Sequence, residues 1–411
     1  MKRPLEGIKV VELSTYAAAP AAGRMLADFG ADVIKIEGLS GEPFRTSFGL
    51  SVNTPVDEDE NPCFQLENAN KRSITLNLKT PEGKQILFDL LKDANIFFTN
   101  TRINSLKKLG IDYDSLKDQF PHLVYGHVSG YGFKGPDYAL PGFDITAFWA
   151  RGGGIADLAF EGKGPISAPY AVGDHASTLA LVSGLLGALY KQKVTGEGDY
   201  VLVSLFGVSV FINGLMITPC QEGYGDKFPK DPYAPLSPIS NTYNCSDGNM
   251  ITLTILDYVR DWAKFCKVIE REDLIGDERY NNPTAVKENY ENSKALVKII
   301  EEIFAKKPQA HWVRLLTEYD LPFSKAQHFK DIPNDPQALE NGYVVPFTFP
   351  NGSKKYIPST PVQFQENVAA PCNRAPYLGE HTTEILKELG YSEEKITSLI
   401  SQKVTSQHVK S

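Results

Sequence analysis

Asp174 is the residue of this sequence best placed to do covalent chemistry. It follows Gly173 and comes shortly before an apolar stretch, residues 177–190, that predicts a long helix. An aspartate at this position ordinarily caps the helix, because its carboxylate accepts a backbone N–H. A carboxylate at a helix N-terminus also stays ionised, and an ionised carboxylate can act as a nucleophile. The sequence is compatible with both roles, and Gly173 would let a substrate approach closely.

A second candidate site is a concentration of cations between residues 71 and 108. This stretch holds eight Lys and Arg and three Asp and Glu, so its net charge is +5 within a chain whose net charge is −8. Most of these side chains are typical of solvated helix faces. Four of them lie close to predicted strands, where loop cations can converge on a phosphorylated ligand: Lys71, Arg72, Lys107 and Lys108.

Several common kinds of site have no sequence signature here. The first strand-to-helix loop, residues 14–20, contains no glycine, so the dinucleotide fingerprint is missing, and no Walker phosphate loop is present. The five cysteines are scattered without a C-x-x-C pair, which predicts neither zinc nor disulfides and favours a reducing cytoplasm. His127, Asp144 and His175 are isolated candidates, because their spacing matches no Ser/His/Asp or Cys/His array.

The elements that must position these residues alternate between strands and helices. Six short apolar runs predict strands, at residues 8–13, 32–37, 73–78, 95–99, 123–129 and 199–205. Helical stretches begin at Pro20, at Thr80 and near Ser105. The alternation predicts an α/β fold with a doubly wound parallel sheet. Four prolines between residues 220 and 240 then indicate a crossing, and a hairpin at residues 241–256 opens a smaller α+β region.

Length and composition fit a soluble protein of two or three domains. The chain has 411 residues, 42% of them hydrophobic and 22% charged, which argues against global disorder. The negative net charge argues against a general nucleic-acid binder. No run reaches the roughly 18 apolar residues of a membrane span, and the N-terminus carries no export signal.

Motifs along nearly the whole chain resemble those of family III CoA-transferases, the group that includes formyl-CoA transferase, carnitine CoA-transferase and α-methylacyl-CoA racemase. They are PLEGIKVVEL at residues 4–13, ADFGADVIKIE at 27–37, NANKR at 68–72, GYG at 130–132, GD at 173–174, TGEG at 195–198 and LGEHT at 378–382. Four motifs are most similar to the 2-hydroxyacid CoA-transferases that act on phenyllactate or 2-hydroxyisocaproate. These are LENANK at 66–71, KGPD at 134–137, PGFDITAFWARGG at 141–153 and GDH at 173–175.

The resemblance implies a fold and a domain layout. The family has a Rossmann-like large domain, an inserted smaller α+β domain and an interlocked homodimer. For this chain it implies a large CoA-binding and catalytic domain that begins with residues 1–225, a small domain at 226–325, and a segment at 326–411 that returns to the large domain.

The resemblance also implies a chemistry for Asp174. The carboxylate would attack an acyl-CoA and give an acyl anhydride, which the CoA thiolate would convert to an aspartyl-CoA thioester. A free acid would then take the CoA. Backbone N–H groups near Gly173 or at residues 152–154 are the candidates for stabilising the oxyanions.

Contacts with the ligands carry over residue by residue. The CoA contacts match Lys71, Arg72, Asn100, Arg102, Lys108 and Arg45. The expected substrate pocket consists of Tyr16, Ala17, Phe143, Asp144 and His175. Formyl-CoA transferase has a glutamine at the position of Ala17, so the replacement suggests a more apolar acyl group, and the glycine-run loop of that enzyme is missing here.

We therefore expect a cytoplasmic homodimeric enzyme that moves CoA from an enoyl- or aryl-enoyl-CoA to a 2-hydroxy acid of amino-acid fermentation. Coenzyme A is a substrate, and we expect no metal, no NAD, no nucleic acid and no membrane partner. One alternative is an acyl-CoA racemase or epimerase, but its histidine base matches Phe143, which cannot transfer a proton. Another is a non-catalytic CoA-binding subunit of a dehydratase complex, against which Asp174 argues. A 2-hydroxyacyl-CoA dehydratase is a candidate partner.

Overall fold

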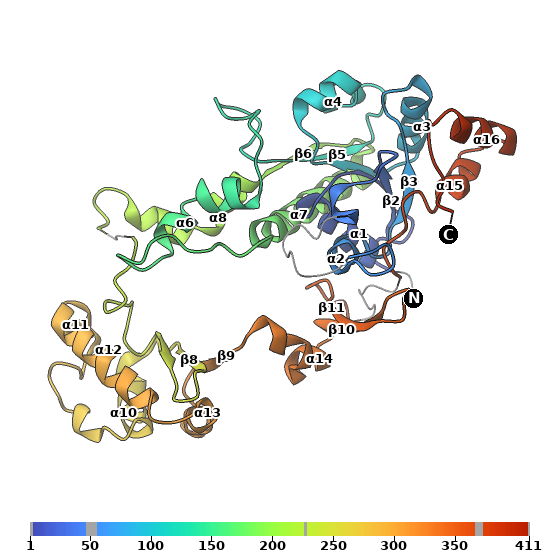
Figure 1. Ribbon diagram of the computed structural model, residues 1–411. Coiled ribbons are helices and arrows are strands. Elements are labelled where there is room, and N and C mark those ends of the chain that lie inside the picture. The colour runs from blue at the N-terminus through green and yellow to red at the C-terminus, as the bar shows by residue number, and fades with distance from the viewer. Residues whose placement is uncertain (1–2, 47–55, 226–227, 366–372, 410–411) are drawn as a thin grey trace. The chain divides into compact units, whose positions relative to one another are not determined.

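The computed structural model describes residues 3–46, 56–225, 228–365 and 373–409, and the chain separates into two compact units (Figure 1). The larger unit consists of Met1–Gly154, Ser167–Pro219 and Pro336–Ser411. The smaller unit consists of Ile155–Ile166 and Cys220–Asp335. The domain boundary that the sequence suggested at residue 226 lies outside the described residues.

A six-stranded parallel sheet forms the centre of the larger unit (Figure 1). Its strands are β1 (Lys9–Leu13), β2 (Asp32–Glu37), β3 (Arg72–Thr75), β4 (Ile96–Thr99), β5 (Val124–Ser129) and β6 (Tyr200–Ser204). They lie in the order β3-β2-β1-β4-β5-β6, and every neighbouring pair is parallel. The expected α/β fold with a doubly wound parallel sheet is therefore confirmed.

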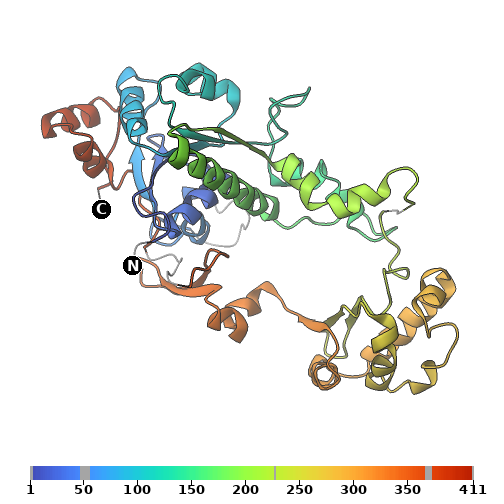
Figure 2. The same cartoon turned by 180° about the vertical axis from the view of Figure 1, so that it is seen from behind.

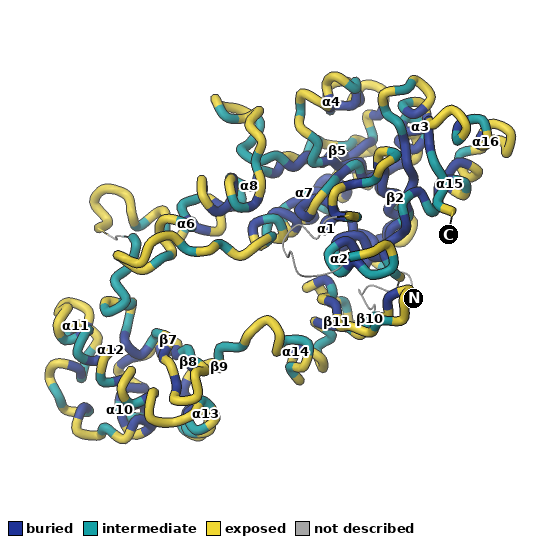
Figure 3. The backbone as a smooth tube through the Cα atoms, viewed as in Figure 1, coloured by how far each residue is buried: buried dark blue, intermediate teal, exposed yellow. Residues whose placement is uncertain are grey.

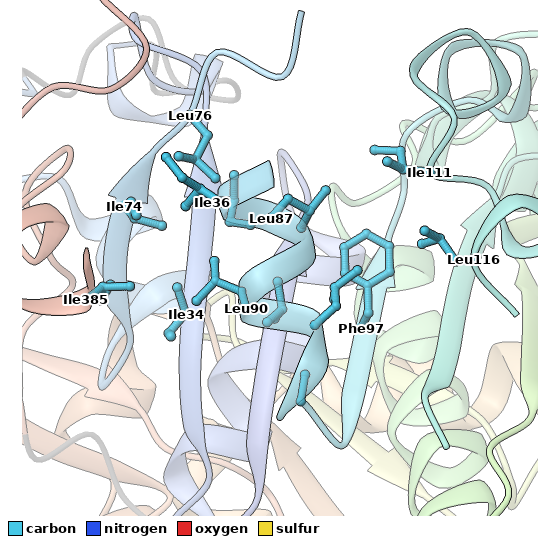
Figure 4. Packing of buried hydrophobic residues seen from close by; sticks show 14 of the residues in the cluster. Ile34, Ile36, Ile74, Leu76, Leu87, Leu90, Phe97, Ile111, Leu116 and Ile385 are labelled. Carbon is cyan, nitrogen blue, oxygen red and sulfur yellow. The ribbon is translucent and has the colours of Figure 1, made fainter. Parts of the chain in front are cut away.

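Helices cover both faces of this sheet because the strand residues alternate between two apolar cores. On one face, Val10, Val33 and Ile96 pack with α1 (Ala18–Asp28) and α7 (Val172–Thr195), which lie side by side in Figures 1 and 2. On the other face, Val11 and Phe97 pack with the remaining helices of the sheet (Figure 4). Those helices are α3 (Pro81–Lys92), α4 (Ile103–Leu109), α5 (Tyr113–Leu116), α15 (Thr382–Glu388) and α16 (Glu393–Ser401).

Helix α7 is longer than the stretch 177–190 that the sequence predicted. It runs for 24 residues, Val172–Thr195, and ends at Gly196, whose left-handed backbone favours glycine. By length and composition alone it could cross a membrane. Leu181, Leu185 and Leu189, however, are buried in the core against α1 and the sheet. Figure 3 shows long buried stretches along α7, which is typical of the central helix of a folded domain.

Shorter elements complete the larger unit. Its other helices are η1 (Pro43–Arg45), α2 (Pro62–Asn68), the π-helix η2 (Asp144–Ala150), α8 (Leu205–Ile212), α9 (Gly214–Ile217) and α14 (Pro336–Glu340). Strands β10 (Val344–Thr348) and β11 (Lys354–Pro358) form an antiparallel pair. Helices α6 (Gly154–Asp157) and η3 (Thr218–Cys220) lie where the chain passes between the units.

The smaller unit is an α+β structure with its own core. Strands β7 (Thr242–Asn244), β8 (Met250–Leu253) and β9 (Phe323–Ala326) form an antiparallel sheet, which confirms the predicted hairpin. Its helices are α10 (Tyr258–Val268), η4 (Glu272–Leu274), α11 (Pro283–Lys287), α12 (Tyr290–Phe304), α13 (Gln309–Glu318) and η5 (Phe329–Asn334). Trp262, Phe265, Phe304 and Trp312 are buried at the centre.

Candidate active site

The site lies at the carboxyl ends of β1 and β4, where the strand order reverses and α/β proteins usually bind ligands. The loop after β1 begins at Ser14, and the loop after β4 begins at Asn100. The side chain of Asn100 accepts a hydrogen bond from the Thr15 N–H at 3.1 Å and donates one to the Thr15 carbonyl at 2.7 Å. Asn100 therefore fixes the β1–α1 loop across the reversal point.

A cluster of buried ion pairs also supports the β1–α1 loop. Lys35 pairs with Glu12 at 3.1 Å and with Glu42 at 2.8 Å, and Lys71 pairs with Glu12 at 2.7 Å. Burial alone would lower the pKa of Lys35, but the surrounding carboxylates raise it, so the side chain stays charged. Glu42 also accepts the Tyr16 N–H at 2.7 Å. Tyr16 has φ +67°, and this hydrogen bond holds its strained backbone in place.

Asp144 caps the N-terminus of α7, so the carboxylate of Asp174 is not used as a cap. The backbone N–H of Asp174 donates to Asp144 Oδ1 at 3.1 Å, and Ala171, the N-cap residue, provides no side-chain cap. The interpretation of Asp174 as the helix cap is therefore wrong, because that function belongs to a side chain 30 residues earlier. A Cβ on Gly173 would clash with Asp144 Oδ1 and with the Phe148 ring, so only glycine fits there.

The Asp174 carboxylate is a half-buried group in an acidic environment. Burial, together with the charges of Asp144 and Glu67, raises its pKa to about 7, while the charge of His175 opposes this shift. Within the described residues, no side chain or N–H donates a hydrogen bond to this carboxylate. A carboxylate of high pKa with unoccupied oxygens has the properties of a nucleophile.

His175 follows Asp174 in the sequence and pairs with Glu67 of α2. The distance from His175 Nε2 to Glu67 Oε1 is 3.0 Å. The pKa of His175 is raised, mainly by this hydrogen bond, because Glu67 stabilises the charged imidazolium. Glu67 was not predicted from the sequence, since its partner is 108 residues away and no local spacing links them.

Two aromatic rings stand beside the Asp144 end of the site. Tyr16 contacts Phe143 edge to face, with ring centroids 5.9 Å apart, and contacts Phe44 in the same way. Phe143 is 56% exposed and Tyr16 39%, so both rings keep surface available to a ligand. Ala17 is buried in a small apolar cluster with Phe44, against which Ala171 packs.

Helix contacts bring these segments together. The Thr178 hydroxyl, one turn after Asp174, donates to the Ala18 carbonyl at 2.7 Å and ties α7 to the start of α1. The structure thus gathers at one place all the residues expected in the substrate pocket and the expected nucleophile: Tyr16, Ala17, Phe143, Asp144, His175 and Asp174.

Three of the cations matched to CoA contacts are already paired with carboxylates. Lys71 is fully buried, and besides Glu12 it binds the Pro20 carbonyl and Asn68 at 2.8 Å. The pKa of Lys71 is lowered to about 8 by burial. The other two pair as follows: Arg72 with Asp32, Glu384 and Glu388, and Arg45 with Glu37. These three side chains are engaged in holding the fold.

The other two cations, Arg102 and Lys108, are exposed on α4, which follows Asn100 directly. No carboxylate among the described residues forms an ion pair with either of them. Arg102 is the N-cap residue of α4, shortly after β4 in the chain, and Lys108 lies in the last turn of that helix, so both could bind a phosphate group of a ligand. In the part of the chain that the structure describes, no His, Cys, Asp and Glu side chains form a group of three that could hold a metal ion.

Comparisons with known proteins match nearly the whole chain to one family. The family model for CoA-transferase family III matches residues 5–382. The chain is 44% identical to (R)-2-hydroxy-4-methylpentanoate CoA-transferase of Clostridioides difficile, over 97% of this chain and 99% of that protein. It is 40% identical to cinnamoyl-CoA:phenyllactate CoA-transferase of Clostridium sporogenes, over 97% and 96%. A CAIB/BAIF family protein from Brucella suis has a similar structure, with a TM-score of 0.82 and 27% identity over 95% of this chain and all of that one.

Proposed function

The chain belongs to CoA-transferase family III, and we propose that it moves CoA from an enoyl- or aryl-enoyl-CoA to a 2-hydroxy acid through covalent intermediates on Asp174. It is an enzyme of the CoA-transferase type. The observation that carries the proposed role of Asp174 is its carboxylate, half-buried, with a pKa near 7 and without a hydrogen-bond donor from the described residues. Two similar proteins are named for 2-hydroxy acids with apolar side chains, which supports the substrate class.

The proposed reaction proceeds in four balanced steps. A carboxylate oxygen of Asp174 attacks the thioester carbon of the donor, the C–S bond breaks, and CoA leaves as a thiolate. The thiolate attacks the aspartyl carbonyl of the resulting anhydride and expels the donor acid, which leaves an aspartyl-CoA thioester. The carboxylate of the acceptor acid attacks this thioester and expels the thiolate. The thiolate then attacks the acceptor's carbonyl in the new anhydride, which frees the acceptor's CoA ester and the Asp174 carboxylate.

The electrostatics of the site favour these intermediates. Burial and the charges of Asp144 and Glu67 all disfavour a negative Asp174 carboxylate. Acylation removes that negative charge, so the environment that raises the pKa also stabilises the anhydride and the thioester relative to the free carboxylate. Because Asp144 already accepts the N–H groups of Gly173 and Asp174, and the Gly153 N–H donates to the Ala150 carbonyl, we place oxyanion stabilisation with the N–H groups of Gly152 and Gly154.

The proposed binding of the two substrates rests on which side chains near the site are exposed. Arg102 and Lys108 are exposed cations without carboxylate partners among the described residues, so we assign the CoA phosphates to them. The exposed rings of Tyr16 and Phe143 would contact the branched or aromatic side chain of the acid.

We also propose that the enzyme works in the cytoplasm as a homodimer. Phe211 and Leu215 of α8 and α9 are almost fully exposed in the single chain, and a second copy would cover them. A 2-hydroxyacyl-CoA dehydratase would consume the product and is the proposed metabolic partner. Analytical ultracentrifugation tests the dimer directly, since a sedimenting monomer at micromolar concentration would contradict it.

An exchange assay tests the proposed reaction. Purified protein is incubated with cinnamoyl-CoA and either phenyllactate or 2-hydroxy-4-methylpentanoate, and both CoA esters are followed by chromatography. We expect CoA exchange in the native enzyme and none in Asp174→Ala. The racemase alternative is tested in D₂O with phenyllactyl-CoA, where deuterium entering the α-carbon without CoA exchange would indicate a racemase. Neither signal would indicate a non-catalytic CoA-binding subunit.

A further inference from the structure

Glu67 is a buried carboxylate with a single strong partner, the imidazole of His175. Its side chain is 4% exposed, and Glu67 Oε2 has no hydrogen-bond partner among the described residues. A carboxylate in such a position is costly unless its partner carries a positive charge. The contact at 3.0 Å between His175 Nε2 and Glu67 Oε1 is therefore best satisfied by an imidazolium.

Other charged groups surround the His175–Glu67 pair, and their signs decide how the pair affects Asp174. The charge of Asp174 acts on His175, as does that of Arg24 of α1, while Asp144 at the start of η2 acts on Asp174. Arg24 is itself neutralised by Asp28, 2.8 Å away. On α2, burial and Glu67 raise the pKa of the Cys63 thiol to about 11, so the thiol stays neutral. The imidazolium is thus the positive charge adjacent to the nucleophile.

We propose that His175, held as an imidazolium by Glu67, is a positioning residue that keeps the neighbouring Asp174 carboxylate ionised at neutral pH. The proposal rests on the proposed function, because it assumes that Asp174 is the nucleophile. His175 acts through Asp174 and contacts no reacting atom. Glu67 anchors the imidazole, although its own charge opposes ionisation of Asp174. The two charges of the pair therefore partly cancel at the nucleophile.

This cancellation gives a distinctive set of expected results in the pH profile of kcat/KM. The native profile should have an acid limb near pH 7, where Asp174 ionises. In His175→Gln, the imidazolium no longer offsets the neighbouring acidic groups at Asp174, so the limb should move up by about one pH unit. At pH values below the limb, the activity of this variant should be about tenfold lower than that of the native enzyme. On the alkaline plateau the two activities should be equal.

The double variant Glu67→Gln/His175→Gln removes both charges. Its limb should return toward the native position, so the second substitution should rescue activity near pH 6. A merely structural pair would give the opposite result, since losing both members would impair the enzyme at least as much as losing one. His408→Gln is the matched control, because His408 forms a similar pair with Glu58, with Nδ1 and Oε1 3.2 Å apart, outside this site. It should leave the limb unchanged.

Two outcomes overturn the proposal. A limb that stays in place in His175→Gln would do so, and so would an activity loss of equal size at every pH. In parallel, the native enzyme is treated with acyl-CoA and analysed for covalent modification of Asp174. If Asp174 is modified but the limb does not respond, only the role of His175 and Glu67 fails. If Asp174 is never modified, the proposed function fails with it.

Discussion

Replacing Gly173 with alanine should disable the nucleophile without changing its chemistry. The added Cβ would clash with Asp144 Oδ1 and the Phe148 ring, so Asp144 would have to leave the N-terminus of α7. Overpacking of this kind costs about 1–3 kcal/mol. The lost hydrogen bond from the Asp174 N–H to a charged group costs about 1.5–3 kcal/mol. Because the two effects overlap, we expect a loss of about 2–5 kcal/mol in the free energy of unfolding.

The same displacement should lower kcat by about 100-fold, since a shift of about 1 Å in a catalytic group has an effect of this size. Chemical denaturation measures the stability, and the exchange assay on the folded fraction measures kcat. Gly187→Ala is the control in the same helix, because no atom lies within 4 Å of its added Cβ. That variant should be more stable by about 0.5–1 kcal/mol and fully active. If Gly173→Ala has native stability and native activity, the assignment of Asp144 as the cap that frees Asp174 is refuted.

Three further predictions concern charges. Lys71→Met should lose about 3–5 kcal/mol of stability in denaturant titrations, because it leaves the buried Glu12 carboxylate short of a partner, and an unchanged stability would contradict the buried pair. Lys108→Ala should raise KM for acyl-CoA about 3- to 10-fold at constant kcat. Lys117→Ala, which removes a lysine paired with a neighbouring aspartate, should not, and equal effects of the two would argue against a phosphate contact. Asp174→Asn should raise the melting temperature most at pH 8.5, less at pH 5 and little at pH 3.5. The reason is that the folded-state pKa of Asp174 near 7 lies above its unfolded value of 3.8, so native stability is lost progressively as pH rises from about 4 to 7. A variant no more stable than the native enzyme at pH 8.5 would contradict that pKa.

The sheet was predictable because its signal is local. Each strand carries a short run of apolar, largely β-branched residues. Strands β1 to β5 are largely buried by helices, and the edge strand β6 is only partly buried. Helix α3 was equally readable: Thr80 caps it through the Gly83 N–H, and Pro81 occupies its first position. In such cases the residues that begin an element are neighbours in the sequence.

The beginnings of α1 and α7 were not predictable in this way. Helix α1 starts at Ala18, two residues before Pro20, without any side-chain cap. Helix α7 starts at Val172 because Asp144, far away in the sequence, accepts its N–H groups. Tertiary contacts decide both starts, and they also decide that Asp174 is free to react.

The burial of individual cations and the pairing of Glu67 could not be predicted from the local sequence either. The sequence places Lys71 and Lys108 in the same basic stretch, yet one is buried against Glu12 and the other is exposed. Only the packing of the sheet distinguishes them. Glu67 becomes part of the site because the fold brings His175 Nε2 to 3.0 Å from Glu67 Oε1.

The covalent intermediate on Asp174 is the most direct test of the central claim. The native enzyme is mixed with acyl-CoA without an acceptor acid, quenched in acid, digested and analysed by mass spectrometry. We predict that the peptide containing Asp174 carries CoA as a thioester, and that hydroxylamine converts it to the hydroxamate. CoA exchange that proceeds with an unmodified Asp174, or that persists in Asp174→Ala, would contradict the assignment of this residue as the nucleophile.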